Sequence, residues 1–158
     1  MRHLSRAVAI GVLGVALGPP AAAAADISSF KIARQARLGA DGTTVTLAAT
    51  INCLPATPGF PDSVVLSVSQ SHGSHNGFGV GFTEFECSGV DQRLAIVVPR
   101  FDAFGVDSFR QGKAVVSGCF NSGLVGAGDL GPAEIQVRKH PRKQESVDAL
   151  ADTFSCVD

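Results

Sequence analysis

GADGTTVTLAATINC, residues 39–53, contains a turn followed by the most regular alternation of apolar and polar side chains in the chain. Its first four residues, Gly39 to Gly42, include the Asp-Gly pair that is typical of a tight β-hairpin. Beyond the turn, the residues at every second position are apolar, which is the period of a strand with one buried face. We therefore predict a strand over residues 44–53 that ends at the edge of a core. The core-facing side chains would be Val45, Leu47, Ala49, Ile51 and Cys53.

The same alternation recurs between residues 30 and 139. It predicts further strands over residues 30–38, 64–70, 78–87, 94–98, 109–120 and 133–139, with a bulge within 78–87 where the apolar positions change parity. The polar residues 71–77 and the glycine-rich residues 123–131 are expected to be loops. Seven strands with almost no helical periodicity favour an all-β fold, and specifically an immunoglobulin-like antiparallel β-sandwich over residues 26–139.

The two ends of the chain differ from this central region. Residues 1–25 have the layout of a secretory signal peptide: Arg2 and Arg6, an apolar run over 7–18, and small residues that allow cleavage between Ala25 and Asp26. In the tail, residues 140–158, four apolar side chains recur at helical spacing, so a short helix over 145–154 is expected to pack on the sandwich. These four side chains are Val147, Leu150, Ala151 and Phe154.

Composition and charge narrow the function classes. Without Arg2 and Arg6, 11 basic residues remain against 14 acidic ones, a formal charge of −3. This mild and mixed charge argues against nucleic acid or an anionic membrane surface as a partner. No apolar run after the signal peptide approaches the length of a membrane span. All ten aromatic residues are Phe, which makes a carbohydrate-binding module less favoured, because such modules use Trp and Tyr as stacking platforms.

Four segments in this order resemble a group of small secreted actinobacterial proteins of unknown function. The segments are QARLGADGTTVTLAATINC at 35–53, GFTEFECSG at 81–89, FRQGKAVVSGC at 109–119 and AEIQVR at 133–138. The resemblance implies an immunoglobulin-like sandwich and a distant similarity to the neocarzinostatin-type chromophore carriers. It implies no activity.

The four cysteines are expected to form disulfides, because the chain is expected to be secreted into an oxidising environment. Three pairings are possible, and Cys53–Cys119 would correspond to the bridge between the two sheets of immunoglobulin domains. The pairs Cys53–Cys87 and Cys119–Cys156 are preferred, in part because the resemblance implies them. The second pair would attach the tail to the sheet. Neither a C-x-x-C motif nor the paired spacing of a zinc site is present.

His72 and His75 form an H-x-x-H pattern in the polar segment 71–77. Two imidazoles three residues apart can share a copper, nickel or zinc ion, with Glu84, Glu86 or His140 as further ligands. A metal site needs three or four converging ligands, and the sequence shows only two side by side. A solvated loop is therefore the preferred interpretation, and metal binding is the weaker alternative.

No catalytic residue and no cofactor are predicted. Residues 126–131, GAGDLG, match G-x-G-x-x-G, but Pro132 and a strand follow, where a dinucleotide site needs a helix. The G-x-S-x-G motif of a nucleophile elbow is absent, and Glu84 and Glu86 are expected to be exposed carboxylates. The basic residues 138–143 are expected to be a solvated linker, with an acidic wall polymer or phosphate as an alternative contact.

The preferred hypothesis is a secreted, non-catalytic, immunoglobulin-like module that binds or supports a partner through a loop-bearing end or a sheet face. The partner would be a protein, a component of the cell envelope or a small molecule. An alternative is a carrier of an apolar small molecule, with phenylalanines lining a cleft. The candidate cleft residues are Phe78, Phe82, Phe101, Phe104 and Phe109.

Overall fold

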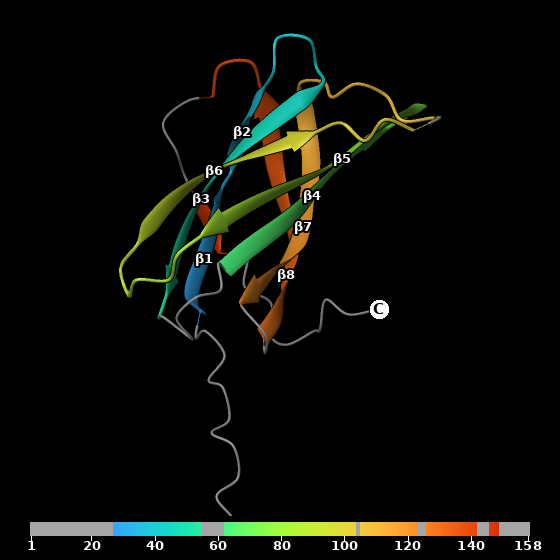
Figure 1. Ribbon diagram of the computed structural model, residues 1–158. Coiled ribbons are helices and arrows are strands. Elements are labelled where there is room, and N and C mark those ends of the chain that lie inside the picture. The colour runs from blue at the N-terminus through green and yellow to red at the C-terminus, as the bar shows by residue number, and fades with distance from the viewer. Residues whose placement is uncertain (1–26, 55–61, 104, 123–125, 142–145, 149–158) are drawn as a thin grey trace, which may run out of the picture.

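The computed structural model describes residues 27–54, 62–103, 105–122, 126–141 and 146–148. All regular secondary structure within these ranges is β-strand (Figure 1), which confirms the predicted all-β fold. The strands are β1 (Ile27–Ala33), β2 (Gln35–Leu38), β3 (Thr44–Cys53), β4 (Asp62–His72), β5 (His75–Phe85), β6 (Gln92–Pro99), β7 (Gly112–Ser122), β8 (Gly126–Arg138) and β9 (Ser146–Asp148).

Strand β3 follows the predicted alternation along its whole length. Its odd-numbered side chains, from Val45 to Cys53, are buried, and its even-numbered side chains are half-buried. On one edge β3 pairs with β6 in an unbroken register from Thr44 to Ile51. On its other edge β3 pairs first with β2 and then with β1.

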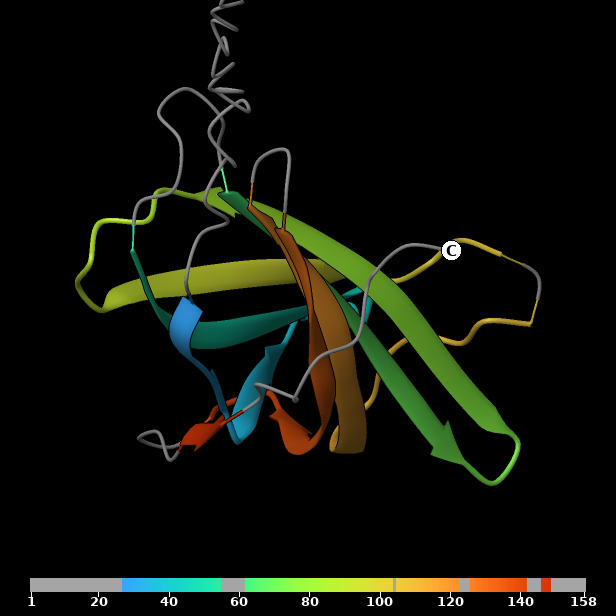
Figure 2. The same ribbon diagram turned by 90° about the horizontal axis from the view of Figure 1, so that it is seen from below.

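The strands form one hydrogen-bonded sheet that folds over on itself. Its order is β5-β4-β7-β8-β2-β3-β1-β9, with β6 on the remaining edge of β3. All of these pairs are antiparallel except β2 with β8. Figure 2 shows the strands arranged around the core, with β3 and β6 opposite β4 and β7. The largest fully buried side chains come from both sides of the fold: Phe30, Ile32, Leu47, Ile51, Leu66, Ile96, Leu130 and Ile135.

The two ends of this folded sheet meet where β5 passes β6. Gly79 and Arg100 form an antiparallel bridge, and the Phe101 N–H donates to the Phe78 carbonyl at 2.8 Å. A Cβ at Gly79 would clash with the Pro99 carbonyl, and a Cβ at Gly81 would lie 2.5 Å from the Val97 carbonyl oxygen. Only glycine at these positions lets the two backbones come this close.

The first predicted strand, residues 30–38, is two strands in the structure. The chain bends at Arg34, between β1 and β2. The bend occurs because the two halves have different partners: β1 pairs with β9, and β2 pairs with β8 in parallel. At the bend itself, the Gln136 N–H donates to the Arg34 carbonyl at 2.8 Å, so the exchange of partners leaves this carbonyl bonded.

Strand β5 contradicts the bulge predicted within residues 78–87. Its register with β4 is continuous from Asp62↔Phe85 to His72↔His75. The apolar positions change parity for a different reason. Glycines occupy buried positions in the first part of β5, so Phe78, Val80 and Phe82 point outward, whereas Phe85 points inward.

Three boundaries also differ from the predictions. The loop expected over 71–77 is only a short turn at Gly73 and Ser74, because β4 and β5 pair as far as His72 and His75. The loop expected over 123–131 is largely strand, since the backbone of residues 126–130 pairs with β7. The helix expected over 145–154 does not include residues 146–148, which pair with the edge of β1 as β9. Residues 149–158, with Cys156, lie outside the described residues.

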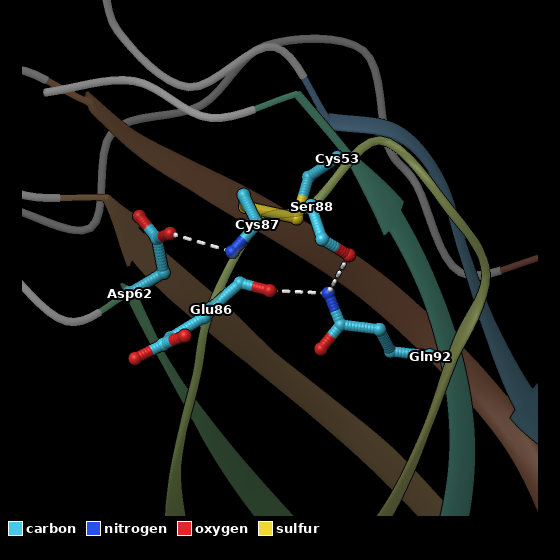
Figure 3. Close-up of a disulfide and its surroundings, with 6 residues drawn as sticks. All are labelled: Cys53, Asp62, Glu86, Cys87, Ser88 and Gln92. Carbon is cyan, nitrogen blue, oxygen red and sulfur yellow. Dashed lines mark hydrogen bonds between the residues drawn. A yellow bond between two sulfur atoms is a disulfide. The ribbon is translucent and has the colours of Figure 1, made fainter. Parts of the chain in front are cut away.

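The predicted disulfide between Cys53 and Cys87 is present in the structure (Figure 3), with a Cα–Cα distance of 5.0 Å. It joins the end of β3 to the segment after β5, so the alternative pair Cys53–Cys119 is excluded. Asp62 accepts a hydrogen bond from the Cys87 N–H at 3.3 Å, and Gln92 donates to the Glu86 carbonyl and to Ser88. Cys119 is half-buried and has no disulfide partner among the described residues; its predicted partner, Cys156, lies outside them, so the pair Cys119–Cys156 stays a prediction.

Removing this disulfide tests its contribution to stability. The bridge spans 34 residues, and closing a loop of that length stabilises a fold by about 3–4 kcal/mol in the chain-entropy model. We expect the double variant Cys53→Ala/Cys87→Ala to lose about that much free energy of unfolding in a denaturant titration. Ser69→Ala, at an exposed residue of β4, is the control and should change it little. A loss below about 1 kcal/mol would contradict this interpretation.

The turn before β3 makes a second prediction, about pH. The Thr43 N–H donates to Asp41 at 3.0 Å and the Thr43 hydroxyl donates at 2.7 Å. The backbone bond first, and then the hydroxyl bond, lower the pKa of Asp41 below its usual value of 3.8. Its charge therefore stabilises the fold above that usual value, and the stabilisation is lost as the pH falls through the lowered pKa.

Asp41→Ala should accordingly lower the melting temperature at neutral pH, and the difference from the wild type should shrink as the pH falls below about 3.8. Asp41→Asn retains an acceptor for the Thr43 N–H without the charge, so its melting temperature should lie between those of the wild type and Asp41→Ala. Thermal unfolding followed by circular dichroism measures all three proteins. A difference that stays constant across the pH range would show that the Asp41 charge has no role.

Candidate functional site

The hairpin of β4 and β5 extends beyond the apolar core. The core-facing side chains of β4 are Val64, Leu66 and Val68, all fully buried. The next two residues of the same parity are Gln70 and His72. The same face of β4 therefore changes from apolar to polar while the strand itself continues. His72 pairs with His75 at the start of β5, which has the same inward parity.

This polar end of the hairpin forms one side of a pocket of about 330 Å³. The segment that leads into β7 forms the other side. The lining residues are Gln70, Ser71, His72, His75, Arg110, Gln111, Gly112 and Lys113. A pocket of this size holds a small molecule or a fragment of a larger one.

Gln70 fixes one wall of the pocket to the other. Its side chain is buried, with 4% of its surface exposed. Its Nε2 donates to the Arg110 carbonyl at 2.9 Å, and its Oε1 accepts from the Arg110 N–H at 2.9 Å. A side-chain amide that satisfies both backbone groups of one residue acts like a rung of a β-ladder. The Arg110 backbone is therefore held in place, and Arg110 is one of the lining residues of the pocket.

His75 is the least satisfied polar group of the pocket. Its side chain is 11% exposed, and its Nδ1 lies 3.3 Å from the Asp107 carboxylate. Neither ring nitrogen makes a hydrogen bond within the described part of the chain. Asp107 itself is held by the backbone of Asn76, whose N–H donates to the carboxylate at 2.9 Å. A buried donor or acceptor without a partner costs about 1–3 kcal/mol, so a ligand or water that bonded Nε2 would stabilise this end of the hairpin.

The structure brings His72 and His75 together, as the weaker metal hypothesis requires, but not their expected further ligands. Both histidines line the pocket. Glu84 lies near the opposite end of β5, and Glu86 and His140 are not among the lining residues. Across residues 27–54, 62–103, 105–122, 126–141 and 146–148, no group of three or more His, Cys, Asp or Glu side chains could hold a metal ion.

The candidate cleft phenylalanines are separated by strand β5. Phe78 and Phe101 meet edge to face with ring centroids 6.1 Å apart. Phe82 and Phe101 are 57% and 54% exposed, whereas Phe109 is buried in the core against the opposite face of β5. Phe104 lies outside the described residues. The rings therefore do not line one cleft.

The outward-facing apolar side chains of this region instead form a patch where β5 passes β6. We call these residues the aromatic patch: Phe78, Val80, Phe82, Val97 and Phe101.

Of the eight lining residues, sequence reasoning singled out only His72 and His75; the missed residues with long polar side chains are Gln70, Arg110, Gln111 and Lys113. For Gln70 a signal was present, because it continues the core-facing parity of Val64, Leu66 and Val68. For the other three no local signal exists. They reach the pocket because β7 pairs with β4, a contact between segments about 40 residues apart.

Replacing Gln70 tests whether it holds the pocket together. Gln70→Ala removes both bonds to Arg110, so we expect a loss of about 1–3 kcal/mol in unfolding free energy and faster amide hydrogen exchange at residues 110–113. Ser69→Ala is the matched control, since Ser69 is exposed and makes only a long bond to the Val115 carbonyl at 3.5 Å. Equal effects of the two variants would show that Gln70 has no special structural role.

Within the described residues, no helix is long and apolar enough to cross a membrane. A comparison with protein-family models, curated proteins and solved structures finds no match for this chain. The functional interpretation therefore depends on the geometry of the chain itself.

Proposed function

We propose that the protein is a secreted, non-catalytic binding module, and that it holds a small polar ligand in the pocket between the β4–β5 hairpin and the start of β7. The observation that carries this proposal is His75, a partly buried pocket residue whose two ring nitrogens are buried and make no hydrogen bond in the described part of the chain. Native proteins leave few buried polar groups unsatisfied, and those exceptions need an explanation. A bound ligand supplies the missing partner.

The strand pairing supports an immunoglobulin-like sandwich as the scaffold. The first strand is divided between two partners: β1 pairs with β3, and β2 pairs in parallel with β8. The remaining pairs are β3 with β6 and the row β5-β4-β7-β8. Two mainly antiparallel layers joined by crossing connections are typical of this architecture. In such folds, ligands bind at segments that connect the strands at the ends of the sandwich.

Secretion is supported by two independent features. Residues 1–25 have the layout of a signal peptide, and the Cys53–Cys87 disulfide is of a kind that persists in oxidising compartments. The resemblance to small secreted actinobacterial proteins agrees with both.

The pocket can be tested with small polar fragments and an NMR spectrum of the backbone amides. We expect fragments to shift the amides of residues 70–75 and 110–113, with dissociation constants of about a millimolar. Ser71→Trp places a large ring at the pocket and should abolish these shifts. Ser74→Trp is the matched control, because Ser74 lies three residues further on, in the turn of the same hairpin, but outside the pocket lining. Shifts that persist in Ser71→Trp, or no shifts with any fragment, would overturn the proposal.

A second candidate is the carriage of an apolar molecule on the aromatic patch. The specific observation in its favour is the exposure of Phe82 and Phe101, each more than half accessible to water. Exposed apolar surface of this kind often marks a binding site. Native mass spectrometry of protein purified from the medium of the source organism would show a bound apolar compound, and Phe82→Ser would release it.

A further inference from the structure

We propose that the ligand of the pocket is a small anion, with a carboxylate or phosphate group bound by Arg110 and the neighbouring basic side chains. This inference rests on the binding role proposed above and adds the chemical class of the ligand. It is carried by the charges of the lining residues, by the anchoring of Arg110 and by the unsatisfied imidazole of His75.

The lining of the pocket contains basic side chains and no acidic ones. Two of its eight residues, Arg110 and Lys113, have permanently charged basic side chains, and none of the eight is Asp or Glu. The whole chain, in contrast, has 14 acidic residues against 13 Lys and Arg. Because Lys113 is paired with Glu134, the positive potential that would attract an anion to this concave site comes mainly from Arg110.

The two acidic residues nearest to the pocket are already engaged. Glu134 pairs with Lys113 at 2.8 Å, on the exposed face of β7 and β8. Asp107 accepts from the Asn76 N–H and lies beside His75 Nδ1. In the described part of the chain, no carboxylate lies within ion-pair distance of the Arg110 guanidinium. Of the two lining residues that are Arg or Lys, Arg110 is therefore the one without an ion pair in the described part of the chain.

Arg110 is also well placed to bind an oxyanion. Gln70 bonds both the backbone N–H and the carbonyl of Arg110. The backbone that carries the Arg110 side chain is therefore already ordered before a ligand binds. A guanidinium presents paired N–H donors whose spacing matches two oxygens of a carboxylate or phosphate. Binding through an anchored backbone loses less conformational entropy than binding through a mobile one.

His75 and Gln111 can supply the remaining donors. Both residues line the pocket, and an imidazole N–H or a side-chain amide N–H can donate to a ligand oxygen. A volume of about 330 Å³ leaves room for a small organic part beside the anionic group. The pocket thus fits a small organic acid or a phosphate ester.

The test is an NMR titration of the full-length mature protein at constant ionic strength with three probes: inorganic phosphate, glycerol 3-phosphate and neutral glycerol. The two phosphates should give saturable shifts at residues 70–75 and 110–113, and glycerol should give none. Arg110→Gln should raise the dissociation constant at least tenfold, and Lys113→Gln two- to threefold, because Lys113 is shared with Glu134. Arg93→Gln, an exposed arginine on β6 far from the lining residues, is the control and should leave binding unchanged.

The outcomes separate this inference from the proposed function. If glycerol binds the pocket as well as the phosphates do, or if Arg110→Gln binds phosphate normally, the ligand is not an anion but the pocket remains a binding site. If no probe shifts the pocket and the fragment screen is also negative, both proposals fall. Soluble poly(glycerol phosphate) distinguishes two sources of the same chemistry: binding of the polymer with the same dependence on Arg110 identifies an envelope polymer, and binding of glycerol 3-phosphate alone identifies a free metabolite.

Discussion

The close approach of β5 and β6 is the constraint on which the rest of the structure depends. Both strands lie at ends of the sheet, and their backbones meet at Gly79 and Gly81 without room for a side chain. The bridge between Gly79 and Arg100 then joins the two ends over the core. Any larger residue at these two positions would force β6 away from β5 and open the buried residues of β4 and β6 to water.

This approach also decides where the aromatic rings lie. Because the inward positions of β5 are glycines, the space beneath them is filled by Phe109 from a distant segment, which contacts Gly77 and Gly79. The rings of β5 itself, Phe78 and Phe82, are left on the outer face. A single cause therefore produces both a buried phenylalanine outside any strand and an exposed aromatic patch.

The same cause explains which parts of the fold could be predicted. Alternation found β3 and β4 because their buried positions carry apolar side chains that differ from their neighbours. It misread β5, where the buried positions carry no side chain and the apolar residues face water. The alternation also predicted β1 and β2 as one strand. The bend at Arg34 that separates them depends on a change of pairing partner, which the pattern of apolar residues does not reveal.

The pocket was partly predictable for a related reason. His72 and His75 stand out as a local pattern, and Gln70 continues the parity of a buried strand, so each is visible in the sequence. Arg110 and Lys113 are visible only once β7 is known to pair with β4. Their basic side chains alone do not indicate a binding site, because charged residues are usually solvated at the surface. They become candidates only when the fold places them beside the two histidines.

The hairpin of β4 and β5 has opposite properties at its two ends. At Asp62 and Phe85 it lies beside the Cys53–Cys87 disulfide, and the Asp62 carboxylate bonds the Cys87 backbone. At His72 and His75, ten residues away along each strand, it carries an imidazole whose buried ring nitrogens make no hydrogen bond in the described part of the chain. The destabilisation at the second end, about 1–3 kcal/mol for the unpaired group, is no larger than the stabilisation of about 3–4 kcal/mol that the disulfide supplies at the first. A hairpin that is covalently secured at one end can therefore tolerate an unpaired polar group at the other, and a ligand of the kind proposed above would stabilise the folded state by binding there.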